Sequence, residues 1–190
     1  YADVFLSLDN EANNDQILFL RGEVGTEKEE FAKYIHYQQH KGLDNFVNLH
    51  LLVFDQQENQ LITKELKTII NTLEKGTIFL SGYSELVLKF QKEIHYFLQS
   101  LPLGEGIKFI VGIDSSKKLK LAMDNEELDI FFSEQNFIDL PPLKQCLQDI
   151  PGLLKGFIGY FGISEKLAPR RFSLASQNIL TKYAWPGNLK

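Results

Sequence analysis

The octapeptide at residues 22–29, GEVGTEKE, holds the residues of this sequence that are best suited to chemistry. In a phosphate-binding loop, glycines let backbone N–H groups surround a phosphate, and a lysine at the start of the next helix reaches the outer phosphates. Gly22 and Lys28 stand at the positions that this arrangement requires. The residues expected to contact a phosphate group are Gly22, Val24, Gly25, Thr26, Glu27, Lys28 and Glu29.

Two acidic residues depart from that arrangement. Glu27 replaces the glycine expected before the lysine, and Glu29 replaces the serine or threonine expected after it. A carboxylate about 4 Å from a phosphate oxygen opposes binding by about 4 kcal/mol at an effective dielectric constant of about 20. Taken alone, the octapeptide has two interpretations: a weakened phosphate loop, or a strand-turn-helix corner with ordinary glycines.

The other reactive side chains give no second site. His36 and His40 lie four positions apart and could supply half of a metal site, but no third ligand has matching spacing. Cys146, the only cysteine, is flanked by Gln145 and Leu147, and neither neighbour could activate a thiol. We therefore expect neither a bound metal nor a cysteine nucleophile.

The composition is acidic. The chain has 25 acidic residues against 20 lysines and arginines, of which three are arginines, and its formal net charge is −5. Its one basic cluster, Lys117, Lys118 and Lys120, is expected in a surface loop. Because nucleic-acid binding needs several cations on one face, we expect this chain to make no contact with nucleic acid.

The cysteine count and the lengths of the apolar runs indicate the cellular compartment. A single cysteine excludes an intrachain disulfide, which fits a reducing environment. The longest apolar runs are far shorter than the roughly 20 residues of a membrane-spanning helix. The sequence therefore predicts a cytoplasmic protein without a membrane contact.

Short apolar runs alternate with amphipathic segments through the first 142 residues, which is typical of a parallel sheet covered by helices. Strands are expected at residues 17–20, 46–53, 76–80, 107–113 and 137–140, and helices at 26–38, 61–73 and 84–101. The octapeptide falls between the first strand and the first helix, as a phosphate loop requires.

Pro141 and Pro142 mark a change in organisation, since proline cannot donate to a strand ladder. After them the pattern turns helical, at residues 144–161 and 173–183. We therefore expect an α/β domain at residues 1–142 and a small helical part at 143–190.

Six segments, in the same order, resemble the AAA+ domain of sigma-54-dependent transcriptional activators, the bacterial enhancer-binding proteins. Residues 22–29 are similar to its GESGTGKE loop, 31–36 to ARAIH and 46–50 to PFVAVNC. Residues 75–82 are similar to the GGTLFLDE Walker B strand, 140–151 to LPPLRERREDIP and 183–190 to YxWPGNVR. The resemblance implies a three-layer P-loop NTPase fold with a parallel five-stranded sheet, followed by the start of a small helical lid.

The sequence departs from the family where the family does its chemistry. Ser81 and Gly82 replace the Walker B aspartate and glutamate, which hold magnesium and polarise the attacking water. Glu85 is the nearest acid that could substitute, although a solvated helix residue is its simpler interpretation. Ile113 and Asp114 replace the Thr-Asn pair of the family's first sensor.

The cations contributed to a neighbouring subunit are also missing. Residues 125–133, which correspond to the family's arginine-finger segment, contain no arginine, and a finger is worth about three to five orders of magnitude in rate. That segment holds Phe131 and Phe132 instead, as core packing or as an apolar interface patch. Lys190 replaces the arginine after the WPGN motif, and residues 49–75 contain no GAFTGA loop for contact with sigma-54.

The resemblance therefore implies a degenerate, ATPase-inactive domain of a bacterial transcriptional regulator, of the two-component response-regulator kind. We expect it to be an oligomerisation or regulatory module, whose partners are other copies or adjacent receiver and DNA-binding domains, without direct sigma-54 contact. Two alternatives remain: a switch that binds ATP or ADP without hydrolysis, and an active ATPase that uses Glu85. No other cofactor is expected.

Overall fold

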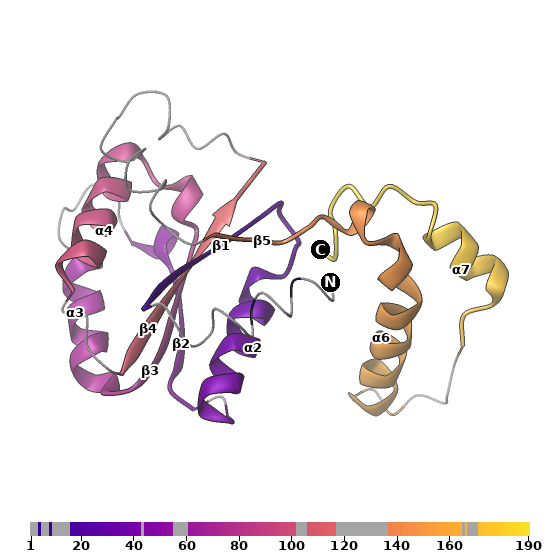
Figure 1. Ribbon diagram of the computed structural model, residues 1–190, viewed down its shortest axis with the longest axis horizontal. Helices are drawn as coiled ribbons and strands as arrows, with labels where there is room; N and C mark the ends of the chain where they lie inside the picture. The colour runs from indigo at the N-terminus through magenta and orange to yellow at the C-terminus, as the bar shows by residue number, and fades with distance from the viewer. Residues whose placement is uncertain are drawn as a thin grey trace.

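A computed structural model describes residues 4, 8, 16–42, 44–54, 61–101, 106–116, 137–164, 166 and 171–190. Its five strands form one sheet in the order β2-β3-β4-β1-β5, and every pair of neighbours is parallel (Figure 1). The strands are β1 (Ile17–Gly22), β2 (Phe46–His50), β3 (Gly76–Ser81), β4 (Ile107–Asp114) and β5 (Phe137–Asp139). The expected parallel five-stranded sheet is confirmed.

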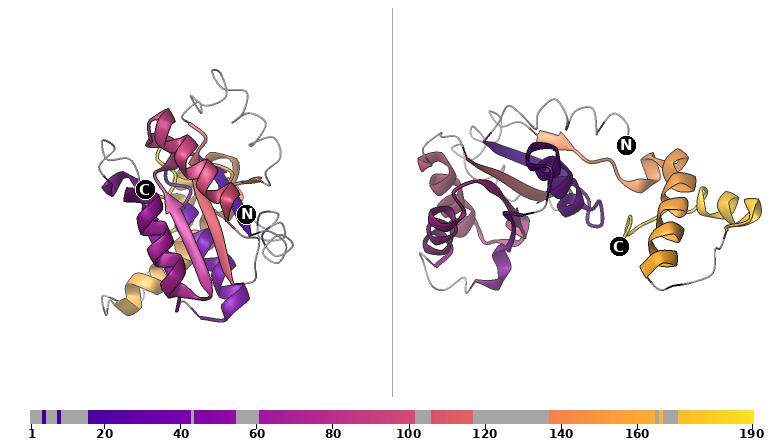
Figure 2. Two further views of the ribbon diagram at one scale, coloured as in Figure 1. Left: turned by 90° about the vertical axis from the view of Figure 1, so that its left-hand side faces the viewer. Right: turned by 90° about the horizontal axis from the view of Figure 1, so that it is seen from below.

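Helices cover both faces of this sheet, which gives three layers (Figures 1 and 2). Helix α2 (Lys28–His40) packs on one face, and α3 (Leu61–Leu73) and α4 (Leu88–Ser100) pack on the other. Alternate residues of each strand serve the two faces: Phe19 lies in the cluster with α3 and α4, whereas Leu18 and Leu20 lie in the cluster with α2. One sheet therefore contributes side chains to two cores, one on each of its faces.

The ends of the first three predicted elements differ from expectation, for local reasons. Helix α2 begins at Lys28 instead of residue 26, because Gly25 and Glu27 both have positive φ. Strand β2 stops at His50 and a 3-10 turn follows, because its ladder partner β3 ends at Ser81, directly opposite. Helix 61–73 lies where the sequence predicts it.

Helix α4 begins at Leu88 instead of residue 84. The chain before it forms a separate 3-10 turn, Tyr83–Glu85, and Leu86 and Val87 are extended. Ser84 is fixed by the sheet, because its Oγ accepts a hydrogen bond of 2.8 Å from the backbone N–H of Asp114. The turn before Leu88 is therefore bonded to the end of strand β4 and is not part of the helix.

After β5 the chain forms two 3-10 turns, Leu143–Gln145 and Leu147–Asp149, and then helices α6 (Ile150–Ser164) and α7 (Leu174–Leu180). The prediction of one helix over 144–161 is wrong at its start, because Pro151 has no N–H for a preceding turn and favours the first turn of a new helix. The predicted helix 173–183 ends early, at Leu180, whose carbonyl oxygen accepts a hydrogen bond from Trp185 Nε1.

Several predictions concern residues outside the described ranges. The lysine cluster at 117–120, the arginine-finger segment at 125–133 and the Phe131-Phe132 pair all fall there. Within the described ranges, no helix combines the length and the apolar character needed to cross a membrane.

Candidate functional site

The predicted phosphate loop connects the end of β1 to the start of α2, as the sequence indicated. Its lysine is bonded to the loop itself: Lys28 Nζ donates to the carbonyl oxygen of Glu23 at 2.8 Å and lies 3.3 Å from Thr26 Oγ1. The same carbonyl oxygen accepts from Thr26 Oγ1, at 2.8 Å. A phosphate at this loop would have to compete with the chain's own oxygen atoms for the ammonium group.

Burial has an electrostatic consequence for this lysine. Desolvation lowers the pKa of Lys28 below its usual range, and the carboxylates of Asp114, Glu85 and Glu27 partly offset that effect. Three acidic side chains therefore stabilise the ammonium group in part, although burial remains the larger effect on its pKa. A bound phosphate would add its own charge to theirs.

Glu27 occupies a backbone position that favours glycine. Its φ is 54° and its ψ is 44°, in the left-handed region, and it precedes the first residue of α2 without a side-chain capping bond. A residue other than glycine in this region costs of order 1–3 kcal/mol. Glu27 thus has a backbone conformation that glycine favours, while its side chain brings a negative charge to the loop.

At the C-terminal end of β3, a serine and a glycine stand where hydrolysis would need carboxylates. Ser81 Oγ is 3.1 Å from His50 Nδ1 and donates to Asn48 Oδ1 at 3.3 Å. Gly82 has a φ of 79°, and a Cβ there would lie 3.0 Å from His50 Cε1, so a larger residue would be strained. Sequence reasoning missed His50 and Asn48, and the parallel pairing of β2 with β3 is the feature that brings them to Ser81.

Asp114, at the end of β4, is the most buried acid of this region, with 6% of its surface exposed. Its Oδ1 accepts hydrogen bonds from the N–H and the hydroxyl of Ser116, at 2.9 and 2.7 Å. Its Oδ2 is buried and has no hydrogen-bond partner among the described residues. No cluster of three potential metal ligands occurs in the same ranges.

A turn near the end of the chain, Trp185 to Lys190, closes over the phosphate loop. Asn188 is 3% exposed, and its Nδ2 donates to the carbonyl oxygen of Val24 at 2.8 Å while its Oδ1 accepts from the N–H of Leu143 at 2.7 Å. The N–H of Leu189 donates to the carbonyl oxygen of Gly25 at 3.0 Å. Two loop carbonyl groups are therefore bonded to this terminal turn.

Contact between the terminal turn and the loop leaves no space for a side chain at Gly25. A Cβ there would lie 2.1 Å from the carbonyl oxygen of Gly187, and the φ of Gly25 is 80°. Trp185 and Asn188, in the turn, also have positive φ values, of 47° and 56°. Backbone strain is thus concentrated on both sides of one contact, as often occurs at functional sites.

A salt bridge reinforces that contact. Lys144 Nζ is 2.8 Å from Glu23 Oε1, and this hydrogen bond is the main reason that the pKa of Glu23 lies below its usual range. Both groups are partly exposed, so the salt bridge orients the chain more than it stabilises it. Together with Asn188, it attaches the loop to the segment that follows β5.

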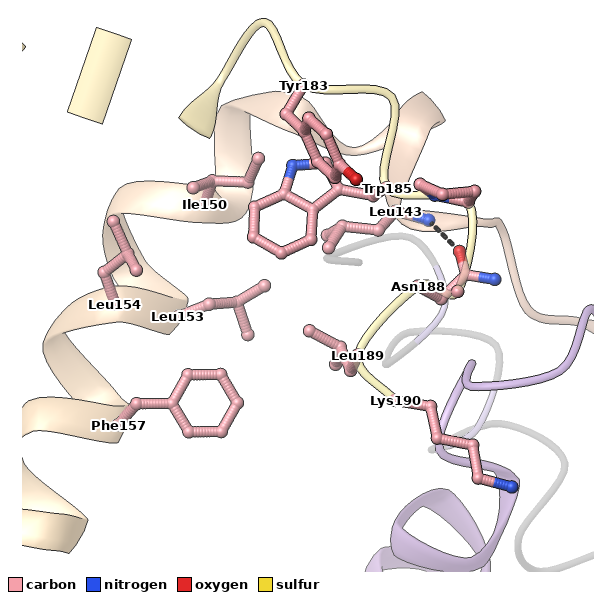
Figure 3. Close-up of a pocket in the computed structure, with 12 residues that line it drawn as sticks. Leu143, Ile150, Leu153, Leu154, Phe157, Tyr183, Trp185, Asn188, Leu189 and Lys190 are labelled. Carbon is pink, nitrogen blue, oxygen red and sulfur yellow. Dashed lines mark hydrogen bonds between the residues drawn. The ribbon is translucent and has the colours of Figure 1, made fainter. Parts of the chain in front are cut away.

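Two cavities border the loop and the terminal turn. The first, of about 420 Å³, lies between α6 and the turn, and the side chains of Leu153, Phe157, Trp185 and Leu189 surround it (Figure 3). The second, of about 1110 Å³, lies between the loop with α2 and the first three turns of α6. Leu153, Phe157 and Leu189 border both cavities.

The structure separates the remaining candidates from this region. Glu29 forms a salt bridge of 2.9 Å with Lys33, one turn further along α2. His36 is fully buried with both ring nitrogens occupied, by Thr77 Oγ1 at 2.9 Å and the carbonyl oxygen of Asp44 at 3.0 Å. Cys146 is buried in the turn region after β5.

Comparison with known proteins gives relatives of one functional kind. An NtrX-like response regulator of Rickettsia typhi is 24% identical over 204 residues, which cover 97% of this chain and 43% of the relative. The transcriptional regulatory protein FlgR of Helicobacter pylori is 26% identical over 201 residues, which cover 94% of this chain and 53% of FlgR. The chain thus spans about half the length of these relatives. No family model matches the sequence.

Solved structures agree on the fold. NtrX from Brucella abortus in complex with ADP superposes with a TM-score of 0.75 at 18% identity, over 99% of this chain and 46% of NtrX. The P-loop NTPase domain of a sigma-54 activator from E. coli gives a TM-score of 0.51 at 23% identity, over 75% of this chain and 94% of that domain. The homologues are sigma-54 enhancer-binding regulators, and the fold is the AAA+ P-loop NTPase fold, as the resemblance implied.

We predict that Asn188→Ala destabilises the chain, because it leaves the N–H of Leu143 and the carbonyl oxygen of Val24 without their bonds. Each buried unsatisfied group costs about 1–3 kcal/mol, so the free energy of unfolding should fall by about 2 kcal/mol or more. Urea unfolding followed by fluorescence of Trp185, the single tryptophan, measures the change.

Asn178→Ala is the matched control, because Asn178 is exposed on α7. Alanine has the higher helix propensity, so this variant should unfold at or slightly above the urea concentration of the wild type. Equal midpoints for Asn188→Ala and the wild type would show that the terminal turn is not held to the loop.

Proposed function

We propose that this chain is a regulatory or oligomerisation domain of a sigma-54-type AAA+ transcriptional regulator, and that it does not hydrolyse ATP. The observation that carries the proposal is the bonding of Lys28 into its own loop, together with a strand β3 that ends at Ser81 and is followed by Gly82. Hydrolysis needs a carboxylate for magnesium and a second one to orient water. A hydroxyl group and a hydrogen atom supply neither.

Two features of the β3 edge support the loss of the catalytic pair. Ser81 is hydrogen-bonded to Asn48 and His50 of the neighbouring strand β2. The positive φ of Gly82 and the closeness of His50 disfavour any larger residue at that position. Glu85 is near enough to influence the pKa of Lys28, but it lies on the turn beyond Gly82 and not on the strand end.

Regulation through association is supported by the surface of the helical part. Four of its large apolar residues have more than three fifths of their surface exposed, namely Tyr160 at 67%, Ile163 at 84%, Leu174 at 78% and Ile179 at 69%. Exposed apolar side chains in such number favour contact with another protein surface. We propose that other copies, or adjacent receiver and DNA-binding domains of the same protein, are the partners, without direct contact with sigma-54.

The wild-type chain should release no phosphate from ATP above the enzyme-free blank, with or without magnesium. A coupled phosphate assay at high protein concentration measures this, and sedimentation velocity of the same samples should show one distribution with and without nucleotide. Phosphate release that disappears in Glu85→Gln would contradict the proposal and identify an active ATPase that uses Glu85.

A second candidate function is a nucleotide switch that binds ATP or ADP without hydrolysis. It is favoured by the retained strand, loop and helix geometry with Lys28 at the helix start. It is also favoured by the NtrX structures from Brucella abortus, which were solved in complex with ADP and with ATP. The carboxylate of Glu27 opposes it, at a cost of about 4 kcal/mol for a separation of about 4 Å.

Isothermal titration with magnesium ATP separates the two candidates. We expect wild-type affinity weaker than about 100 μM, and about tenfold or greater improvement in Glu27→Gly, which removes a charge and suits the positive φ. Glu30→Gln is the control, because Glu30 is a nearby acid already paired with Lys33. Wild-type affinity tighter than about 100 μM would contradict the scaffold function and favour the switch.

A further inference from the structure

One buried histidine bonds the connection between α2 and β2 to the sheet. Helix α2 runs from the phosphate loop to the opposite end of the sheet, where the chain turns into the edge strand β2 (Figure 1). His36 lies one turn before the end of this helix and has no exposed surface. Its ring is hydrogen-bonded to the carbonyl oxygen of Asp44, before β2, and to the hydroxyl of Thr77, in β3. The side chain therefore joins the helix, the turn and the sheet.

These two hydrogen bonds determine which ring nitrogen of His36 carries the proton. A carbonyl oxygen can only accept, so Nε2, which is 3.0 Å from the oxygen of Asp44, must be the N–H nitrogen. In the neutral ring Nδ1 then has no proton, and it accepts a hydrogen bond of 2.9 Å from Thr77 Oγ1. Both ring nitrogens are thus satisfied while His36 is neutral.

A second proton on His36 would break this arrangement. The new N–H at Nδ1 needs an acceptor, so the hydroxyl of Thr77 would have to turn round and accept instead of donating. Thr77 has no exposed surface either, and its hydroxyl has no other hydrogen bond among the described residues. The hydroxyl proton would then be buried without a partner, which destabilises the folded chain.

Burial and a neighbouring imidazole also oppose a charge on His36. The ring of His40 lies against it, with the two ring centroids 4.5 Å apart. Desolvation lowers the pKa of His36 below its usual range, and His40 lowers it further, whereas Asp44 offsets only part of the change. The neighbours on β2 and β3, Phe46 and Thr77, carry no charge. Among the described residues, His40 and Asp44 are therefore the titratable groups that act on this ring.

The turn that His36 holds has a strained backbone. Lys41 and Asn45 have positive φ values, of 56° and 66°, which are unfavourable for residues other than glycine. Gly76 of β3 lies against this turn, since a Cβ there would be 2.2 Å from the carbonyl oxygen of Asn45. The same oxygen accepts a hydrogen bond of 3.1 Å from the N–H of Thr77. Loss of the bonds from His36 therefore favours relaxation of the turn.

We propose that His36 is an acid-sensitive joint between α2, β2 and β3. As the pH falls below neutrality, the ring takes up a second proton, leaves its buried position for water and releases the turn before β2. Because β2 is an edge strand that ends at His50, beside Ser81, this change reaches the C-terminal end of β3. The inference holds whether or not the phosphate loop binds a nucleotide.

Nuclear magnetic resonance of the isotope-labelled full chain tests the joint on the wild type. The ring of His36 should be the Nε2–H tautomer at neutral pH, and its pKa should lie below the usual value of about 6.5. His40→Gln should raise the pKa of His36, whereas His50→Gln, which removes an exposed histidine outside this contact, should leave it unchanged. The Nδ1–H tautomer, or a pKa of about 6.5 or higher, would overturn the proposal.

Hydrogen–deuterium exchange shows where the chain opens. Between about pH 7.5 and 5.5, and after correction for the intrinsic exchange rate, the N–H groups of Lys41 and Thr77 should lose about tenfold or more of their protection. The N–H of Val111, in the strand β4 that is paired on both sides, should keep its protection. An equal loss at all three would overturn the joint in favour of general unfolding by acid, and so would no loss at Lys41 and Thr77.

His36→Gln separates the joint from the other three histidines of the chain. Because the pKa of His36 is lowered in the folded chain, the unfolded chain binds the proton first, so stability is complete above about pH 6.5 and falls below it. This one site should raise the unfolding equilibrium constant by up to about tenfold per pH unit. Glutamine takes up no proton, so the urea midpoint of the variant should change less than that of the wild type between about pH 7.5 and 5.5, where carboxylates stay ionised. Equal changes in the two proteins would overturn the proposal.

Discussion

The side chain of Asn188 connects three separate parts of the chain, and the arrangement of the site depends on it. Its amide group donates to the loop at Val24 and accepts from the backbone at Leu143, where it is almost fully buried. The loop must therefore keep the shape that these bonds fix, with glycine at position 25 and Lys28 turned toward the carbonyl oxygen of Glu23. The loop that resembles a phosphate site is thus bonded to other parts of the same chain.

The parallel sheet explains why the loop, Ser81 and Asp114 meet in one place. Parallel strands bring their C-terminal ends to a single edge, so the loop after β1, Ser81 at the end of β3 and Asp114 at the end of β4 are neighbours. Positions 81 and 82 at that end of the sheet carry no carboxylate, whereas position 27 in the loop carries one. Asp114, Glu85 and Glu27 all act on the ammonium group of Lys28, and they offset part of the desolvation that lowers its pKa.

Much of the fold could be predicted from the sequence, because period-two alternation and apolar runs determine which residues face the cores. The site was only partly predictable. The loop position followed from Gly22 and Lys28, but Asn188 resembled an ordinary part of a motif, and its bond to Val24 spans 164 positions of the sequence. The partners of Ser81 depended on strand order, and the start of α6 depended on the missing N–H of Pro151, which a helical pattern does not reveal.

The phosphate loop joins the sheet to the terminal turn through its hydrogen bonds with Asn188 and Leu189. Hydrogen–deuterium exchange of the loop amides from Gly25 to Glu29, with and without saturating magnesium ATP, tests it most directly. These amides should exchange at the same rate in both samples, because the bonds from Asn188 and Leu189 to the carbonyl oxygens of Val24 and Gly25 already hold the loop in one shape. New protection of the loop when ATP is added would contradict it.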